Sequence, residues 1–272
     1  AFLNLGSTLG SDSDPMFRVP TIKSARELDS MRAAGRVVAE VKERLIQVLE
    51  PGVTTGFLDQ EARKVISDRG AEPSFLNYAP IPGAIPFPGV ICTSLNEEIV
   101  HGIPGERVIE DGDLVKLDVG AVVDGFHGDS AITLIAGEGD SEKKELVEVT
   151  RRALEQGILA SVVGARVGDI SAAVEGYVRP LGFELVREYT GHGIGRRLHE
   201  APQIPNVGVG GQGPQLRDGM VICIEPMVNL GTWRTESLGD GWTVVTADRK
   251  LSAHFEHTLA ITSKGPEILT VL

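Results

Sequence analysis

The chain has 272 residues, of which 42% are hydrophobic and 24% charged, and its formal net charge is −12. This composition is typical of a soluble globular protein with a sizeable core, and the acidic balance argues against direct binding of nucleic acid. No apolar run approaches the ~20 residues that a membrane-spanning helix needs, so no membrane partner is expected.

The first segment of the chain, residues 1–15, lacks the basic start and the apolar centre of a signal peptide. Its Ser, Gly and Asp content and the methionine at position 16 favour a leader or a disordered tail. No charge run or low-complexity linker divides the rest of the chain. We therefore expect residues 16–272 to form a single domain.

Four helices are expected where apolar residues recur at helical spacing. The first runs from Ser24 to Leu49, because Ser24 and Glu27 form a capping box and Pro51-Gly52 stops the helix. The other three cover residues 55–68, 141–163 and 169–181.

The second and fourth of these helices belong to an internal repeat, in which residues 51–72 align with residues 163–184 without a gap. The alignment matches four pairs: Gly52 with Gly164, Gly56 with Gly168, Gly70 with Gly182, and Glu72 with Glu184. Matched helix breakers around matched helices predict two similar halves related by a pseudo-twofold axis. Two copies are too few for a solenoid.

Strands are expected between and after the helices. Leu114–Gly120 and Phe126–Ile135 flank Asp124-Gly125, which is a strong signal for a two-residue hairpin turn. Further strands are expected over residues 220–225, 242–246 and 254–261. Hairpins imply antiparallel pairing, so we predict an α+β fold with antiparallel sheets covered by helices.

The hairpin predicts a register for two aspartates. A two-residue turn places Val123 opposite Phe126 and therefore Asp118 opposite Ala131. Asp129 shares the face of Ala131, so Asp118 and Asp129 become diagonal neighbours, roughly 7 Å apart. The alternative is two solvated aspartates near a turn. It is weakened because both lie in apolar strand sequence, where Asp is depleted and costly to bury without a partner.

Three further residues stand in distinctive contexts. His192 lies among glycines in Gly-His-Gly-Ile-Gly, which indicates that the backbone closely approaches another group. The alternative is a flexible loop with an incidental His. Glu225 ends the apolar run Val-Ile-Cys-Ile, where a helix cap or an ion pair with Arg is the alternative. Glu256 lies between two histidines in an expected strand, and its alternative is the polar face of an edge strand.

Taken together, these residues supply four carboxylates and one imidazole, a donor set that suits a pair of divalent cations. The set is Asp118, Asp129, His192, Glu225 and Glu256. Two bridged metals activate water for hydrolysis near neutral pH. The sequence therefore predicts a dinuclear metallohydrolase. To avoid this conclusion, the structural alternatives given for all five residues would have to hold at once.

Other catalytic classes lack their motifs. The chain has no GxSxG, no HExxH and no GxxxxGK[ST] sequence. The two cysteines, Cys92 and Cys223, are too few for a disulfide framework, which favours free thiols in a cytoplasmic protein. Neither has a histidine partner nearby in sequence, so a cysteine nucleophile is weakly supported. His101 and His199 are second-tier candidates for the site.

An ordered series of motifs resembles the type I methionine aminopeptidases, which have the pita-bread fold. The motifs are Val-His-Gly-Ile-Pro, Asp-Val-Gly, Gly-Asp, Gly-His-Gly-Ile-Gly, Ile-Glu-Pro-Met and Phe-Glu-His-Thr. The match runs from about Ser24 to the end of the chain, and the spacing from Asp118 to Asp129 agrees with the family. The pseudo-symmetric repeat is also what this fold would produce.

The resemblance implies two divalent metal ions, of Mn, Fe(II), Co or Zn. Asp118 would chelate one ion, and Asp129 and Glu256 would bridge the two. His192 and Glu225 would complete the other ion, with Glu225 also the general base for the bridging water.

The resemblance also implies residues that contact the substrate. His101 would hydrogen-bond the substrate amide nitrogen and help to protonate the leaving amine, and His199 would stabilise the oxyanion. The methionine pocket would draw on Tyr78, Phe87, Cys92 and Trp242.

The chain departs from the family pattern in three places: Ala79–Pro86 resembles an insertion, Leu198 stands where an aromatic residue is common, and Phe75 replaces a smaller residue. The implied function is removal of the N-terminal methionine from nascent peptides whose second residue is small, by a monomer near the ribosome. An Xaa-Pro aminopeptidase or prolidase is the closest alternative. A non-catalytic binding protein of the same fold is another.

Overall fold

The computed structural model of the chain describes residues 2–3, 19–81 and 83–272. Its helices are α1 (Ala25–Val48), α2 (Thr55–Asp68), α3 (Ser141–Ala160) and α4 (Val167–Val178), with a 3₁₀ turn η2 (Arg179–Leu181). The strands up to residue 135 are β1 (Phe2–Leu3), β2 (Glu72–Pro73), β3 (Ile91–Leu95), β4 (Glu98–Val100), β5 (Leu114–Val123) and β6 (Phe126–Ile135).

The remaining strands follow α4. They are β7 (Glu184–Leu185), β8 (Tyr189–Gly193), β9 (Glu200–Ile204), β10 (Val221–Ile224), β11 (Met227–Asn229), β12 (Thr235–Ser237), β13 (Val244–Thr246), β14 (Ser252–His254), β15 (His257–Thr262) and β16 (Gly265–Ile268). Every pairing between the described strands is antiparallel. The predicted α+β class is therefore confirmed.

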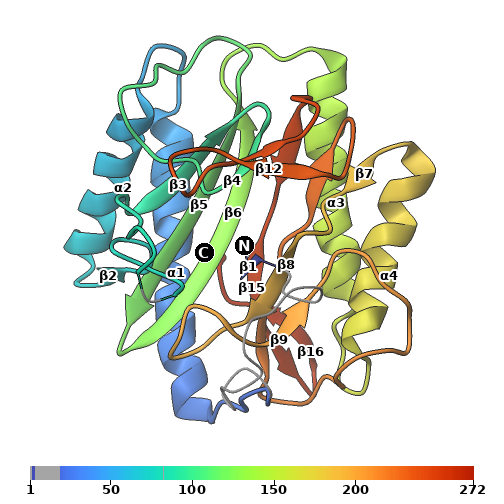
Figure 1. The fold of residues 1–272 in the computed structure, drawn as a ribbon. Helices are drawn as coiled ribbons and strands as arrows, with labels where there is room; N and C mark the ends of the chain where they lie inside the picture. The colour runs from blue at the N-terminus through green and yellow to red at the C-terminus, as the bar shows by residue number, and fades with distance from the viewer. Residues whose placement is uncertain (1, 4–18, 82) are drawn as a thin grey trace.

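Helices form the two outer sides of the molecule and strands lie between them (Figure 1). On one side, α1 and α2 cover the sheet of β2, β3, β5 and β6. On the other side, α3 and α4 pack on the second half of the chain, whose main sheet has the order β1-β8-β10-β15-β16. The two sets of strands face each other across the middle.

Each helical layer rests on an apolar core. In the first half, Val41 and Leu45 of α1 pack with Leu117 and Val119 of β5, and all four are fully buried. A buried side chain of this size contributes about 1.5–3 kcal/mol. Comparable clusters lie under α3 and α4. The repeated helical layers therefore hold the strands in place.

The predicted start of α1 is confirmed. The Ser24 side chain accepts a hydrogen bond from the Glu27 backbone N–H, and the Glu27 carboxylate accepts one from the Ser24 N–H. These two bonds satisfy N–H groups that the first turn of a helix leaves without partners.

The internal repeat is confirmed at the level of single hydrogen bonds. Both copies begin with a glycine at positive φ, 101° at Gly52 and 92° at Gly164. The matched backbone bonds are Gly52 N–H to Ile109 O and Gly164 N–H to Leu216 O, then Gly56 N–H to Gly105 O and Gly168 N–H to Gln212 O. At Gly56 and Gly168 a Cβ would lie within 3 Å of a backbone oxygen, so only glycine allows the loop to approach the helix.

The predicted hairpin register is also confirmed. Val123 faces Phe126 and Asp118 faces Ala131, with Asp124 and Gly125 at positive φ in the turn. Such a turn matches the twist of the flanking strands, which explains why the two-residue signal was reliable. Strand β5 extends to Val123, beyond the predicted end at Gly120.

Some predicted boundaries were wrong. Helix α3 ends at Ala160 rather than 163, because the Ser161 N–H and hydroxyl bond back to Ile158 O and Gly157 O. Helix α4 starts at Val167 and becomes 3₁₀ after Val178.

The strand predicted over residues 254–261 is two strands. β14 pairs with β11 and β15 pairs with β10, so the chain changes sheets at Phe255-Glu256. Sequence alternation could not show this change of partner. β3, β4, β8 and β9 were not predicted, and β8 replaces the flexible loop considered for His192.

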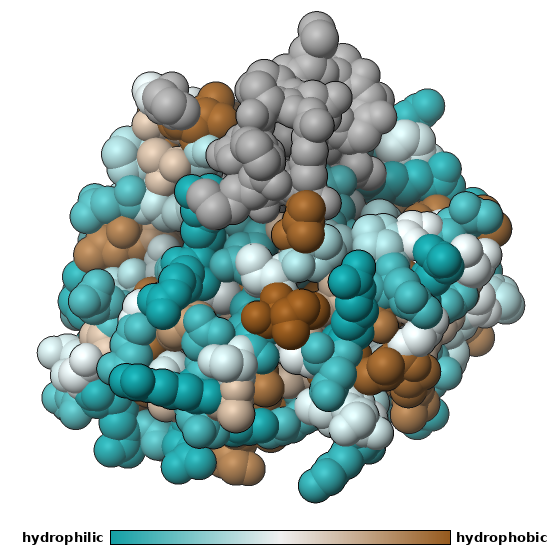
Figure 2. Space-filling view, turned by 90° about the horizontal axis from the view of Figure 1, so that it is seen from below, coloured by the Kyte–Doolittle hydropathy of each residue, from teal (hydrophilic) through white to brown (hydrophobic). Residues whose placement is uncertain are grey.

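The expected leader falls on residues that are largely outside the described part, apart from Phe2–Leu3, which pair with β8. Among the described helices, none combines the length and the apolar character that spanning a bilayer requires. On the face shown in Figure 2, hydrophobic residues form small groups among hydrophilic ones, as on ordinary water-exposed surfaces.

Candidate metal centre

The five predicted donor residues meet between the two halves. Asp118 lies on β5 and Asp129 on β6, while His192 lies on β8. Glu225 follows β10 directly, and Glu256 lies in the break between β14 and β15. Each of the five is at most 4% exposed. A cluster of four carboxylates buried this deeply requires positive charge nearby.

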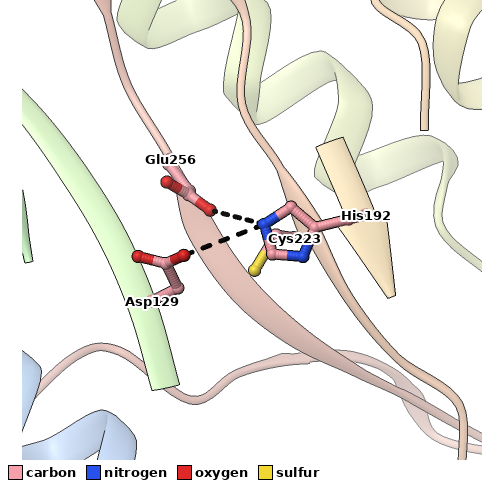
Figure 3. Close-up of side chains that lie close together, drawn as sticks. All are labelled: Asp129, His192, Cys223 and Glu256. Carbon is pink, nitrogen blue, oxygen red and sulfur yellow. Dashed lines mark ion pairs between the residues drawn. The ribbon is translucent and has the colours of Figure 1, made fainter. Parts of the chain in front are cut away.

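The imidazole of His192 faces three carboxylates. Its Nε2 atom lies 3.5 Å from Glu225 Oε1, 3.7 Å from Asp129 Oδ2 and 3.9 Å from Glu256 Oε1. Figure 3 shows the carboxylates of Asp129 and Glu256 side by side, both directed at this nitrogen. The distances are too long for good hydrogen bonds. They suit donor atoms around one shared ion, each about 2.0–2.2 Å from it.

The orientation of His192 supports this arrangement. Its Nδ1 atom lies 2.9 Å from the Gly193 carbonyl oxygen. A carbonyl can only accept, so Nδ1 carries the proton and the neutral ring presents the lone pair of Nε2 to the carboxylates. Burial lowers the pKa of His192 to about 4, which keeps the ring neutral.

Several buried atoms of the cluster lack hydrogen-bond partners within the described part of the chain. They are Asp118 Oδ1, Asp129 Oδ1, His192 Nε2 and both carboxylate oxygens of Glu256. Buried polar atoms are rarely left without partners in native proteins. Oxygens and one imidazole nitrogen are suitable donors for borderline divalent cations. The residues present therefore fit the binding of divalent metal.

The carboxyl groups differ in their protonation. Burial raises the pKa of Glu256 and of Asp129 well above the usual range, and the neighbouring carboxylates raise both further. Burial also acts to raise the pKa of Glu225, but its surroundings, including a side-chain hydrogen bond with His254, bring the pKa below its usual range. Repulsion between the carboxylates is what bound cations would relieve.

Two residues join the cluster that sequence reasoning had not assigned to it. His254 Nε2 lies 3.5 Å from Glu225 Oε2, and these residues with Glu256 form a second group with metal-ligand spacing. Cys223 lies beside Asp129, His192 and Glu256 in the first such group (Figure 3). Burial raises the pKa of the Cys223 thiol well above its usual range.

Asp118 belongs to neither of these groups, but its carboxyl shares a side-chain hydrogen bond with Asp129. The separation of His254 from Glu256 by two residues was the available signal for His254. In an unbroken strand this spacing only places two side chains on the same face. It does not indicate that His254 approaches Glu225, because that contact depends on the break at Phe255-Glu256.

The two second-tier histidines lie beside the cluster. The ring centroid of His199 is 4.4 Å from that of His192, and His199 Nδ1 is hydrogen-bonded to the Tyr78 hydroxyl at 2.6 Å. Burial and His192 lower the pKa of His199 well below its usual range. The ring of His101 packs edge-on against Tyr189 and Trp242.

The four predicted pocket residues belong to one apolar cluster, which also contains the two unusual residues Phe75 and Leu198. The ring of Phe87 contacts that of Trp242 at 5.2 Å. The insertion at residues 79–86 is closed at its base, because the Phe87 N–H donates to Tyr78 O. Trp242 Nε1 donates to Ile85 O, which ties the end of the insertion to this cluster.

Residues 29–263 match metallopeptidase family M24. The chain is 48% identical to a methionine aminopeptidase of Aquifex aeolicus, with 92% of this chain and 98% of that protein covered. Its structure is similar to that of the methionine aminopeptidase of Thermotoga maritima, with a TM-score of 0.90, 43% identity and coverage of 93% and 100%. A prolidase of Pyrococcus furiosus shares the fold at 20% identity and a TM-score of 0.76, over 94% of this chain and 67% of that one.

Proposed function

The chain belongs to metallopeptidase family M24, within the methionine aminopeptidases, and we propose that its buried cluster removes N-terminal methionine with two divalent metal ions. The observation that carries the proposal is the convergence of three buried carboxylates on one imidazole nitrogen. The metals would be Mn, Fe(II), Co or Zn, since an oxygen-rich site with one histidine accepts each of them.

The donors divide between the two ions. Asp118 would hold one ion, His192 and Glu225 would hold the other, and Asp129 and Glu256 would serve both. When bound, the metals polarise the substrate carbonyl and lower the pKa of water. Glu225 would accept the proton of the attacking water. The position of Glu225 beside His192 and His254 supports this role, because a carboxylate there can accept the proton.

His199 and His101 act on the substrate. The Tyr78 hydroxyl donates to Nδ1 of the neutral His199 ring, so its proton lies on Nε2, which donates to the oxygen of the scissile carbonyl. His101 bonds the substrate amide nitrogen and helps to protonate the leaving amine. The packing of its ring against Trp242 supports a position at the edge of the pocket.

The methionine side chain lies in the apolar cluster of Tyr78, Phe87, Cys92 and Trp242. An unbranched thioether adapts to such a lining and packs well on aromatic rings. The scissile peptide bond lies next to His199 and the metal-binding carboxylates. The second residue of the substrate must fit beside them, so a small one is preferred. The enzyme acts as a monomer in the cytoplasm on peptides emerging from the ribosome.

Peptide specificity separates this function from its alternatives. We expect hydrolysis of a Met-Ala peptide, no hydrolysis of Xaa-Pro peptides, and loss of activity with a chelator. Preference for Xaa-Pro peptides would instead indicate a prolidase-type enzyme. Such enzymes share the fold of this chain. Binding of two metals without hydrolysis of either peptide would indicate a non-catalytic protein.

A further inference from the structure

One face of the β5–β6 hairpin forms a polar seam against the second half of the molecule. Side chains alternate along a strand, so Lys116 and Asp118 of β5 share one face. The register adds Thr133, Ala131 and Asp129 of β6 to the same face. The metal cluster lies at one end of this seam and Lys116 at the other.

The seam joins the hairpin to the segment from Ser252 to Thr258, which carries Glu256. Its bonds are Thr133 Oγ1–H to His254 O at 2.7 Å, His254 N–H to Thr133 Oγ1 at 2.8 Å, Glu256 N–H to Ala131 O at 2.9 Å and Asp129 N–H to Thr258 Oγ1 at 3.0 Å. These bonds set the position of Glu256 relative to Asp118 and Asp129 across the two halves.

Lys116 closes the far end of the seam. Its ammonium donates to Ser252 O at 2.9 Å and to Asn96 O at 2.8 Å, and the residue is 1% exposed. The Ser252 N–H also donates to Asn96 O, at 3.1 Å. Among the described residues, Lys116 forms no ion pair within 4.0 Å, and the two backbone carbonyls are the acceptors of its hydrogen bonds.

We propose that Lys116 is a positioning residue whose ammonium clamps Ser252 to the β5 strand and thereby fixes Glu256 against Asp118. The inference rests on the proposed dinuclear centre. A buried ammonium costs more free energy than an apolar side chain of the same length. A methionine would fill the same space as Lys116. Packing therefore does not explain a lysine at this position, whereas its hydrogen bonds to Ser252 and Asn96 do.

The test compares Lys116→Met with a matched control, Leu117→Ala. Leu117 is the next residue of β5, is fully buried, and faces the helix-covered core instead of the seam. Metal is titrated into both metal-free variants by calorimetry, and melting temperature is measured beside it. Lys116→Met should lower the affinity for at least one ion by about 10–100-fold, as residues that orient metal ligands commonly do.

The control separates positioning from general stability. Leu117→Ala should melt at lower temperature while keeping both metal affinities within about threefold of wild type. Lys116→Gln, which can still donate to one carbonyl, should fall between Lys116→Met and wild type, and it replaces Lys116→Met if that variant does not fold. Undiminished binding of both metals by the Lys116 variants would overturn the inference, as would an equal loss in Leu117→Ala.

These outcomes are distinct from failure of the proposed function. If wild type binds no metal pair or does not hydrolyse a Met-Ala peptide, the function itself is wrong. If wild type does both and the Lys116 variants bind metal equally well, only the clamp is wrong.

Discussion

In the first half of the molecule, the donors Asp118 and Asp129 lie inside two long paired strands, whereas in the second half Glu225 and Glu256 lie where strands end. The loops and helices around them repeat, down to matched hydrogen bonds at Gly52 and Gly164. The repeated parts are apolar and hold the fold together. The parts that differ carry the chemistry.

The halves also differ in charge. The first half supplies carboxylates whose pKa values are raised by burial. The second half supplies Glu256, whose pKa is raised in the same way, and also two histidines, His192 and His254, each 3.5 Å from Glu225. The first half is therefore suited to binding cations, and the second to binding cations and accepting a proton. The predictions below test this division, from the largest expected effect to the smallest.

The largest effect should come from Glu256→Gln, which removes a bridging charge between the halves. Gln has one neutral oxygen donor and an NH₂ group that cannot coordinate, so two cations would be left under-neutralised. We expect activity to fall by about 10³-fold or more, together with metal affinity. His192→Ala, which loses a ligand of one ion only, should be less affected. Near-wild-type binding of two metals by Glu256→Gln would show that this residue does not bridge.

Alanine at His101 or His199 should separate substrate chemistry from metal binding. Both rings lie beside the cluster rather than among its assigned donors. We expect kcat to fall by about 10²–10³-fold, the contribution of a positioned proton-transfer or oxyanion group. Metal content measured on the same samples should stay at the wild-type level. Loss of a metal equivalent in either variant would reassign that histidine as a ligand.

Tyr78→Phe should have a smaller effect, because it removes only the hydroxyl that orients His199. We expect kcat to fall about tenfold, the equivalent of one hydrogen bond to a group active in the transition state, with KM little changed. NMR of ¹⁵N-labelled histidine should show the proton of His199 on Nε2 in wild type and a mixture of tautomers in the variant. An unchanged spectrum would contradict the orienting role.

The smallest effect concerns the stability of metal-free protein. Folding raises the pKa of Glu256 above its unfolded value, so its contribution to stability is full at low pH and is lost as pH rises through the folded pKa. Metal-free wild type should therefore melt at lower temperature near neutral pH than in mild acid. Metal-free Glu256→Gln cannot ionise there and should melt about 2–6 °C higher than wild type. Equal melting temperatures of wild type and Glu256→Gln near pH 8 would contradict the proposed repulsion between the carboxylates.

Much of the first half could be predicted from sequence. The Asp124-Gly125 turn and the alternation of apolar residues fix the hairpin register, and with it the positions of Asp118 and Asp129. The glycines of the repeat predicted the matched loops because few residues adopt positive φ.

The second half could be predicted less well, because its donors depend on contacts between distant segments. Glu256 lies where the chain leaves β14 for β15, and neither strand alone indicates that break. The bond from Lys116 to Ser252 joins residues 136 positions apart. His254 approaches Glu225 only once both halves are packed. Short motifs could name the donors in this half, but they could not give their arrangement.

The most direct test of the account is peptidase activity measured against the number of metal ions bound. Protein freed of metal with a chelator, and checked by elemental analysis, should not hydrolyse a Met-Ala peptide. Activity should return as Mn(II), Co(II) or Fe(II) is added, with binding complete at two ions per chain. Full activity in metal-free protein would contradict the central claim that the carboxylates of the two halves form a dinuclear metal centre.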